Sequence, residues 1–207
     1  MRGKDIKKGT YQYKDLHIIA YFPVKKYNIE DYPAVDNYLQ QAKWSNKVPD
    51  GFGKLMLEQS GKSHIVEGIK FKSRKFTHNK WFEVQDSISY WDDFNKQKIV
   101  YSEIVQTPQF YLDKDNKFMV DATAYIMVGN KIEYLIDWLN SKTMGWAFKR
   151  WYTVNLGDKG FRYQKQFIQK LPIPLPKNDK TNFSESDIHQ ILSLTEEEIN
   201  FIQNTLQ

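Results

Sequence analysis

The chain has 207 residues, of which 41% are hydrophobic and 15% are aromatic. It can therefore bury a sizeable core, and it is too rich in aromatic rings to be largely disordered. It has no cysteine, which excludes disulfides, thiolate metal sites and a cysteine nucleophile, and which fits a reducing compartment. No apolar run approaches the roughly 18 residues of a membrane span, and no secretion signal opens the chain. We expect a soluble, cytoplasmic protein.

The net charge of +5 conceals an uneven distribution along the chain. Residues 179–207 hold six acidic residues and one lysine, a net of −5, so residues 1–178 carry +10. A basic body of this kind attracts polyanions such as nucleic acid, although many surfaces of similar charge bind nothing. Charge alone therefore favours a nucleic-acid partner without identifying one.

The first 80 residues predict a strand, a helix and a long irregular insertion. Residues 16–22 (LHIIAYF) are β-branched and aromatic, as in a buried strand. A helix is expected next, with Asp31 as its cap and Pro33 in its first turn. Residues 45–80 lack periodicity, so we expect an insertion with one short helix near residues 54–59.

The middle of the chain predicts a meander of short strands. Residues 99–104, 109–112 and 124–128 are rich in β-branched and aromatic side chains. Residues 113–117 (DKDNK) are typical of a turn and lead into residues 118–121, which indicates a hairpin.

The last third predicts helices on either side of a proline-rich boundary. An amphipathic helix is expected over residues 132–151, weakened by Gly145. Residues 171–176 (LPIPLP) cannot lie inside a helix. We expect a domain over residues 1–176 and a small helical element over residues 177–207. The predicted fold class is α+β, with a twisted, mostly antiparallel sheet and packed helices.

Two short amphipathic helices are expected after the boundary. Ser184 and Thr195 are suitable caps, and Thr195 with Glu198 matches a capping box. Their apolar side chains need a surface to cover, either on this domain or on a partner. These are Ile188, Ile191, Leu192, Leu194, Ile199, Phe201, Ile202 and Leu206.

Two segments interleave cations with aromatic rings and amides, the mixture that holds phosphates and reads base edges. They are residues 80–86 (KWFEVQD) and 159–174. The second begins within a loop that is framed by Gly157 and Gly160. A solvated, flexible surface is the plainer alternative for each. The candidate DNA-binding residues are Lys72, Arg74, Lys75, Lys80, Gln85, Lys159, Arg162, Tyr163 and Gln164.

Four blocks carry a resemblance to a known family. They are residues 2–6 (RGKDI), 80–103 (KWFEVQDSISYWDDFNKQKIVYSE), 132–142 (IEYLIDWLNSK) and 156–174. In this order the chain resembles the TaqI-like C-terminal specificity domain. That domain is the target-recognition part of adenine-specific DNA methyltransferases in type II restriction-modification systems, including fused methyltransferase-endonucleases.

The resemblance implies sequence-specific recognition of double-stranded DNA without catalysis by this chain. The chain has no Asn-Pro-Pro-Tyr element, and residues 50–53 (DGFG) are a poor Gly-rich turn. By this resemblance, S-adenosylmethionine would bind to a methyltransferase catalytic domain in the same or another chain. Whether that domain also binds magnesium stays open. The opening Met1-Arg2-Gly3-Lys4 leaves open whether the chain is a fragment or a separate subunit.

Two other functions stay open at this point. A metal-dependent nuclease could use Asp50, Glu58 or Glu67, but neither glutamate has a lysine two residues on. The four histidines are scattered without ligand spacing, which disfavours zinc. A protein-interaction module would use the C-terminal helices. The recognised bases, DNA cleavage by the parent enzyme and the oligomeric state are not determined by the sequence.

Overall fold

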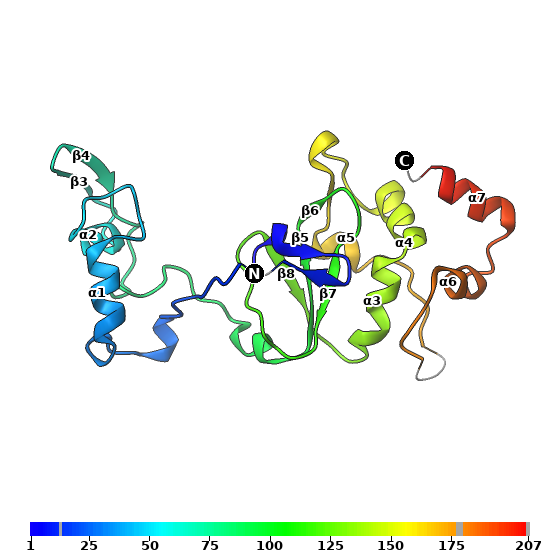
Figure 1. The fold of residues 1–207 in the computed structure, drawn as a ribbon, viewed down its shortest axis with the longest axis horizontal. Helices are drawn as coiled ribbons and strands as arrows, with labels where there is room; N and C mark the ends of the chain where they lie inside the picture. Colours follow the sequence, from blue (N-terminus) through cyan, green and yellow to red (C-terminus); the bar gives the residue numbers. More distant parts are fainter. Residues whose placement is uncertain (13, 177–179, 206–207) are drawn as a thin grey trace. The chain divides into compact units, whose positions relative to one another are not determined.

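The computed structural model describes residues 1–12, 14–176 and 180–205. The chain forms two compact units (Figure 1). Met1–His17 with Tyr90–Gln207 is called the sheet unit, and Ile18–Ser89 is called the hairpin unit. The α+β class is confirmed. The domain boundary expected after residue 176 falls within the sheet unit and stays a prediction.

The core of the sheet unit is a three-stranded antiparallel sheet in the order β7-β5-β8. Its strands are β5 (Lys98–Ser102), β7 (Phe110–Asp113) and β8 (Ala124–Met127). Every residue of β5 is buried, because both of its faces are covered. Ile99 packs on one face with helix side chains such as Ile132 and Leu139. Its neighbour Val100 packs on the other face in a second cluster, with Ile6 and Ala124. Burial on both faces explains why a continuous apolar run marks this strand.

A hairpin of β1 (Ile6–Lys7) and β2 (Thr10–Tyr11) belongs to the second cluster, where Ile6 is fully buried. The chain approaches this hairpin through Gly3. A Cβ at Gly3 would lie within 2.4 Å of the Thr123 carbonyl oxygen, so a larger residue could not pass so close to that backbone.

A fully buried ion pair joins β5 to β7. Lys98 Nζ lies 2.6 Å from Asp113 Oδ2, and the two residues are directly opposite in the strand register. Lys98 also donates to the Phe94 carbonyl at 2.9 Å. The Asp113 carboxylate accepts from the backbone N–H groups of Lys117 and Phe118, each at 3.0 Å. Both charges therefore have hydrogen-bond partners besides each other, which a buried pair requires.

The strands predicted within the sheet unit after residue 90 are confirmed with two differences. The strand expected over residues 99–104 is divided, because β6 (Ile104–Val105) pairs instead with β9 (Phe161–Arg162) in a separate sheet. The strand expected over residues 118–121 is wrong. After the turn, the backbone N–H groups of Lys117 and Phe118 bond to the Asp113 carboxylate and not to the backbone of β7, so this segment does not continue as a paired strand. A short helix, α5 (Lys165–Ile168), follows β9.

The single helix expected over residues 132–151 is three elements. They are α3 (Ile132–Asn140), α4 (Lys142–Ala147) and a π-helical turn, η5 (Phe148–Tyr152). The interruption lies at Ser141, whose backbone is extended.

Ser141 starts α4 by accepting a hydrogen bond from the Met144 N–H at 3.0 Å. Gly145, expected to weaken the helix, has a packing role instead. A Cβ there would lie 2.7 Å from the Pro108 ring, so the glycine allows α4 to approach Pro108.

The C-terminal helices form where the sequence predicts them. They are α6 (Glu185–Ile191) and α7 (Glu196–Asn204). Ser184 and Thr195 cap them, each within a complete capping box. Leu206, also expected in the apolar set, lies outside the described residues.

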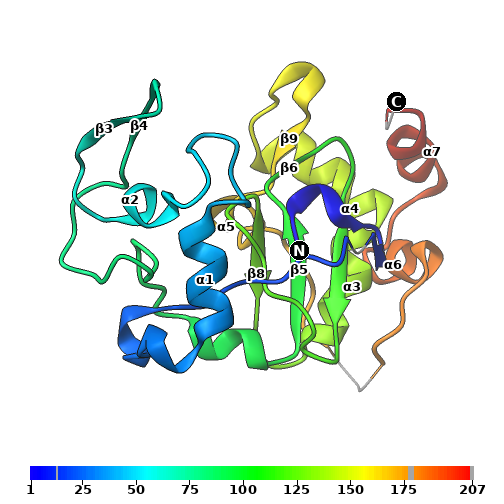
Figure 2. The same cartoon turned by 60° about the vertical axis from the view of Figure 1, so that its left-hand side comes forward.

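These helices pack on the sheet unit itself, beside α3 and α4 (Figure 2). Ile188 is fully buried with Tyr134 and Trp138 of α3. The Glu185 carboxylate accepts from the first two backbone N–H groups of α4, at 2.9 and 2.8 Å. Burial acts to raise the pKa of Glu185, but these bonds and one from the Thr143 hydroxyl outweigh it and hold the pKa below its ordinary value.

The hairpin unit contains α1 (Pro33–Gln41), α2 (Gly53–Leu57), β3 (Ser63–Val66) and β4 (Ile69–Lys72). Both helices are confirmed, but Asp31 does not cap α1: the N-cap is Tyr32, and Asp31 lies in the 3-10 turn before it. The β3-β4 hairpin was not predicted within the insertion. Short 3-10 turns occur in both units. They are η1 (Gly3–Asp5), η2 (Pro23–Lys25), η3 (Ile29–Asp31), η4 (Trp91–Asn95) and η6 (Gly157–Lys159).

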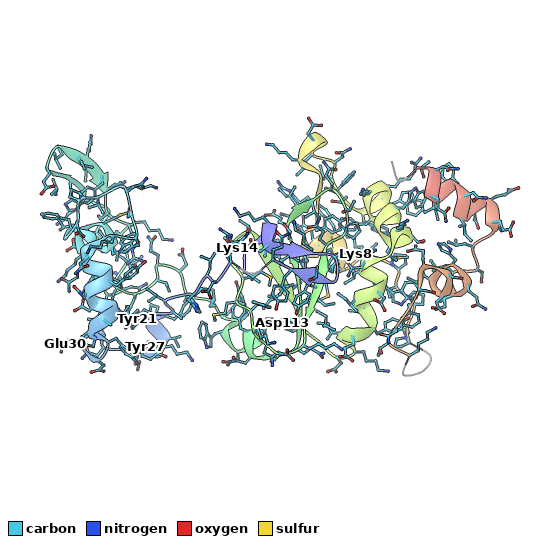
Figure 3. The ribbon with its side chains drawn as sticks, in the orientation of Figure 1. Lys8, Lys14, Tyr21, Tyr27, Glu30 and Asp113 are labelled. Carbon is cyan, nitrogen blue, oxygen red and sulfur yellow. The ribbon has the colours of Figure 1, made fainter. Side chains whose placement is uncertain are left out.

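The strand expected over residues 16–22 is wrong. This segment connects the two units and pairs with no strand, so side chains such as Leu16 and Ile18 stay about half exposed. Tyr21 is its buried residue. The Tyr21 ring packs in a buried cluster of the hairpin unit with Phe82, and it lies edge to face with the exposed ring of Tyr27, 5.6 Å between centroids (Figure 3).

Replacing Asp113 with alanine should destabilise the protein by about 3–5 kcal/mol, because it leaves the Lys98 ammonium buried without a counter-charge. Urea unfolding followed by circular dichroism measures the change. The matched control is Asp115→Ala, which removes an exposed partner of Lys117 and should have little effect. Equal effects of the two substitutions would contradict the role given to the buried pair.

Ile188→Ala should cost about 2–5 kcal/mol of stability, because it leaves a cavity among Tyr134, Trp138 and Met144. Ile191→Ala, one turn along the same helix at a largely exposed position, is the control and should be nearly neutral. Thermal unfolding of both variants distinguishes a docked C-terminal helix from a free one, for which the two variants would behave alike.

Candidate nucleic-acid interface

The loop between η5 and β9 has the tight geometry that its glycines predict. Gly157 and Gly160 both have positive φ, 64° and 106°, and the Gly160 N–H donates to the Gly157 carbonyl at 2.9 Å. A Cβ at Gly160 would lie 2.6 Å from the Val105 carbonyl carbon and oxygen. The loop is therefore held against β6, and its side chains project from a fixed backbone.

Three of the predicted residues in this part of the chain have side chains at or near the surface. Lys159 is exposed at the loop. Arg162 Nε lies 3.9 Å from Glu103 Oε1, beyond hydrogen-bond distance, and has no hydrogen-bond partner in the described part of the chain. Glu103 Oε1 instead accepts from Gln164 Nε2 at 3.1 Å. Nε itself is buried, whereas the Arg162 side chain as a whole is 39% exposed. The long ion pair with Glu103 holds this side chain only weakly.

Tyr163 does not lie at the surface as a DNA-contacting side chain would. It is 2% exposed and stacks on Phe148 with 4.3 Å between ring centroids. Burial raises the pKa of its hydroxyl well above the ordinary value. The Tyr163 ring belongs to the core, and its backbone N–H donates to the Glu103 carbonyl at 2.6 Å.

The π-helical turn adds residues that the candidate set lacked. Lys149 Nζ lies 4.9 Å from the centre of the Phe161 ring, which places the turn beside β9, and burial lowers the pKa of Lys149. Arg150 is exposed over the Trp146 ring, and Trp151 is 63% exposed. The sequence signal is Lys-Arg-Trp directly after an amphipathic helix, which gives adjacent cations and an aromatic ring.

The remaining candidates lie in the hairpin unit, and one of them points inward. Arg74 Nε donates to the Leu57 carbonyl at 2.7 Å and Arg74 Nη2 to the Trp81 carbonyl at 2.5 Å. Because its guanidinium donates to backbone carbonyls, Arg74 stabilises the fold of this unit and does not face a ligand. Lys72 is exposed on β4.

Lys75, Lys80 and Gln85 are placed at the base of the hairpin. Lys75 Nζ forms an exposed ion pair with Asp86 at 2.6 Å, and the Gln85 amide donates to the Lys75 carbonyl at 3.4 Å. Lys80 Nζ donates to the Tyr27 carbonyl at 3.4 Å. The structure thus brings Lys75 and Gln85 together. Their role in DNA binding stays a prediction, as it does for the whole candidate set.

Across residues 1–12, 14–176 and 180–205, no three His, Asp or Glu side chains gather as ligands for a metal ion. In the same part of the chain, no helix has the length and apolar character needed to cross a membrane.

Basic side chains projected from fixed loops and hairpins of an α+β scaffold are characteristic of a nucleic-acid recognition module. Residues 1–173 match the family described as the TaqI-like C-terminal specificity domain, and the chain belongs to that family. It is a DNA-binding specificity domain of restriction-modification systems, a part that carries specificity and not catalysis. The matched region ends before α6 and α7.

Proposed function

We propose that this chain recognises a specific sequence in double-stranded DNA for an adenine-specific methyltransferase of a bacterial restriction-modification system. The observation that carries the proposal is Arg162, an arginine whose side chain is 39% exposed beside a loop of fixed backbone. Its planar guanidinium can donate two parallel bonds to O6 and N7 of guanine.

The exposed lysines have a different role in this proposal. Lys159 and Lys80 are exposed point charges on flexible stems, which suit phosphate oxygens of any sequence. They set the position of the domain on the duplex. Gln164 and Gln85 are amides that can pair with adenine, although each now bonds within the protein.

The chemistry of methyl transfer lies in a methyltransferase catalytic domain, in the same or another chain, in the cytoplasm. That domain would bind S-adenosylmethionine and extrude the target adenine from the duplex. Magnesium would be needed where the parent enzyme also cuts DNA. The specificity domain contributes the choice of site.

The isolated chain should bind duplex DNA weakly, with an affinity that falls by about 0.9 log units per log unit of salt for each phosphate contacted. Fluorescence anisotropy over a series of salt concentrations measures this slope. With S-adenosylmethionine or magnesium added, the DNA should stay unmethylated and uncut. Absence of binding at low salt, or methyl transfer by the pure chain, would contradict the proposal.

Arg162→Ala should reduce discrimination between a preferred and a scrambled duplex by about 1–3 kcal/mol, because the bidentate contact to guanine is lost. The preferred duplex is obtained by selecting a random duplex library on the wild-type chain. Lys159→Ala is the control and should weaken binding to both duplexes equally. If Arg162→Ala also shifts both affinities by one factor, Arg162 is at most a phosphate contact.

A further inference from the structure

The β3-β4 hairpin has two chemically different faces. In its antiparallel register His64 lies opposite Phe71, and Phe71 is buried with side chains of the α1-α2 region. Neighbouring residues along a strand point to opposite faces. The outer face therefore carries the two intervening pairs, Ser63 with Lys72 and Ile65 with Lys70.

The outer face is exposed and basic. Ile65 is 73% exposed, and Ser63, Lys70 and Lys72 are exposed as well. Among the residues that the structure describes, neither lysine forms an ion pair. The one acidic residue between positions 60 and 75 is Glu67, which lies in the turn at the tip. The outer face thus places these two lysines beside an exposed isoleucine. Such a surface suits a ligand that carries both negative charge and apolar groups.

The hairpin is a rigid ribbon and not a flexible loop. Glu67 and Gly68 both have positive φ, as in a type I′ turn, whose twist matches that of the paired strands. Hydrogen bonding continues below the strands, from the Gly61 N–H to the Arg74 carbonyl at 2.8 Å and from the Ser73 N–H to the Lys62 carbonyl at 2.9 Å.

The base of the ribbon is fixed by the inward-pointing arginine. Arg74 donates to the backbone carbonyls of Leu57, at the end of α2, and of Trp81, so it ties the end of β4 to two other segments of the unit. The hydroxyls of Ser60 and Ser73 bond to each other at 2.8 Å across the strands. In Figure 1 the ribbon projects beyond α1 and α2 of its own unit. A projecting ribbon of fixed orientation can enter a groove without a large loss of conformational entropy.

We propose that the β3-β4 ribbon enters the major groove of double-stranded DNA with its outer face toward the base edges. Lys70 and Lys72 donate to O6 and N7 of guanine, and Ile65 packs against the methyl group of thymine. The Ser63 hydroxyl can donate a hydrogen bond to a base edge or accept one from it. The major groove of B-DNA, about 12 Å wide, admits a two-stranded ribbon without distortion, whereas the minor groove is about 6 Å wide. This inference rests on the proposed function and names a second reading element in it.

The experiment uses the full chain and the duplex that the wild-type protein selects from a random library. Replacing thymine by uracil in that duplex removes a methyl group from the major groove and changes nothing in the minor groove. Wild-type affinity should fall about fourfold when the methyl group under Ile65 is lost. Ile65→Ala should bind the uracil duplex and the thymine duplex almost equally.

The lysines are tested by their effect on discrimination. Lys70→Ala with Lys72→Ala should reduce the ratio of affinities for selected and scrambled duplexes at least about fivefold. The matched control is Lys43→Ala with Lys47→Ala, which removes the same charge from exposed positions of the same unit. It should weaken both duplexes alike. Circular dichroism confirms that each variant is folded, as expected for substitutions of exposed side chains.

The possible failures are distinguishable. If the wild-type chain binds no DNA or selects no sequence, the proposed function fails and this inference fails with it. If the wild type selects a sequence but the ribbon variants keep full discrimination and full sensitivity to uracil, only the ribbon inference is overturned. The same holds if the ribbon and control lysine pairs act alike, since the ribbon would then contribute charge and no base reading.

Discussion

The buried ion pair between Lys98 and Asp113 fixes the centre of the sheet unit. A buried charge is tolerated only when a counter-charge and hydrogen-bonding groups lie in good geometry around it. The pair therefore determines the register of β5 with β7 and orders the turns that hold Phe94 and Lys117. Glu103, just past the other end of β5, accepts the backbone N–H of Tyr163 and the side chain of Gln164. The segment of β9 that follows the loop framed by Gly157 and Gly160 is thus attached next to the same strand that holds the ion pair.

One rule of strand geometry places the candidate DNA-binding side chains in both units. Tyr163 is buried, and the side chain of Arg162 directly before it is 39% exposed. Phe71 is buried, and the lysines on either side of it are exposed. Because successive side chains of an extended backbone alternate between faces, an aromatic ring fixed in the core orients its polar neighbours. The buried rings in these basic segments therefore fix the backbone and leave the cations beside them at least partly exposed.

The acidic C-terminal element has a structural use for much of its charge. Asp187 and Glu198 complete capping boxes, and Glu185 caps α4 from a different helix. Carboxylates are favourable at helix N-termini, where backbone N–H groups lack partners. With Ile188 buried on α3, the element is part of the sheet unit although it follows the region matched by the family.

Features that depend on neighbouring residues were determined by the sequence itself. Ser184 and Thr195 mark the starts of α6 and α7, Pro33 lies at the start of α1, and Gly157 with Gly160 frames the loop, because capping and positive φ are local requirements. Only the tertiary structure decided the rest. Residues 16–22 have strand composition but no strand to pair with, and Tyr163 and Arg74 have the composition of a binding surface but point inward. Pairing and burial depend on segments far away in the chain, so composition alone cannot separate a buried ring or an internally bonded guanidinium from one that meets DNA.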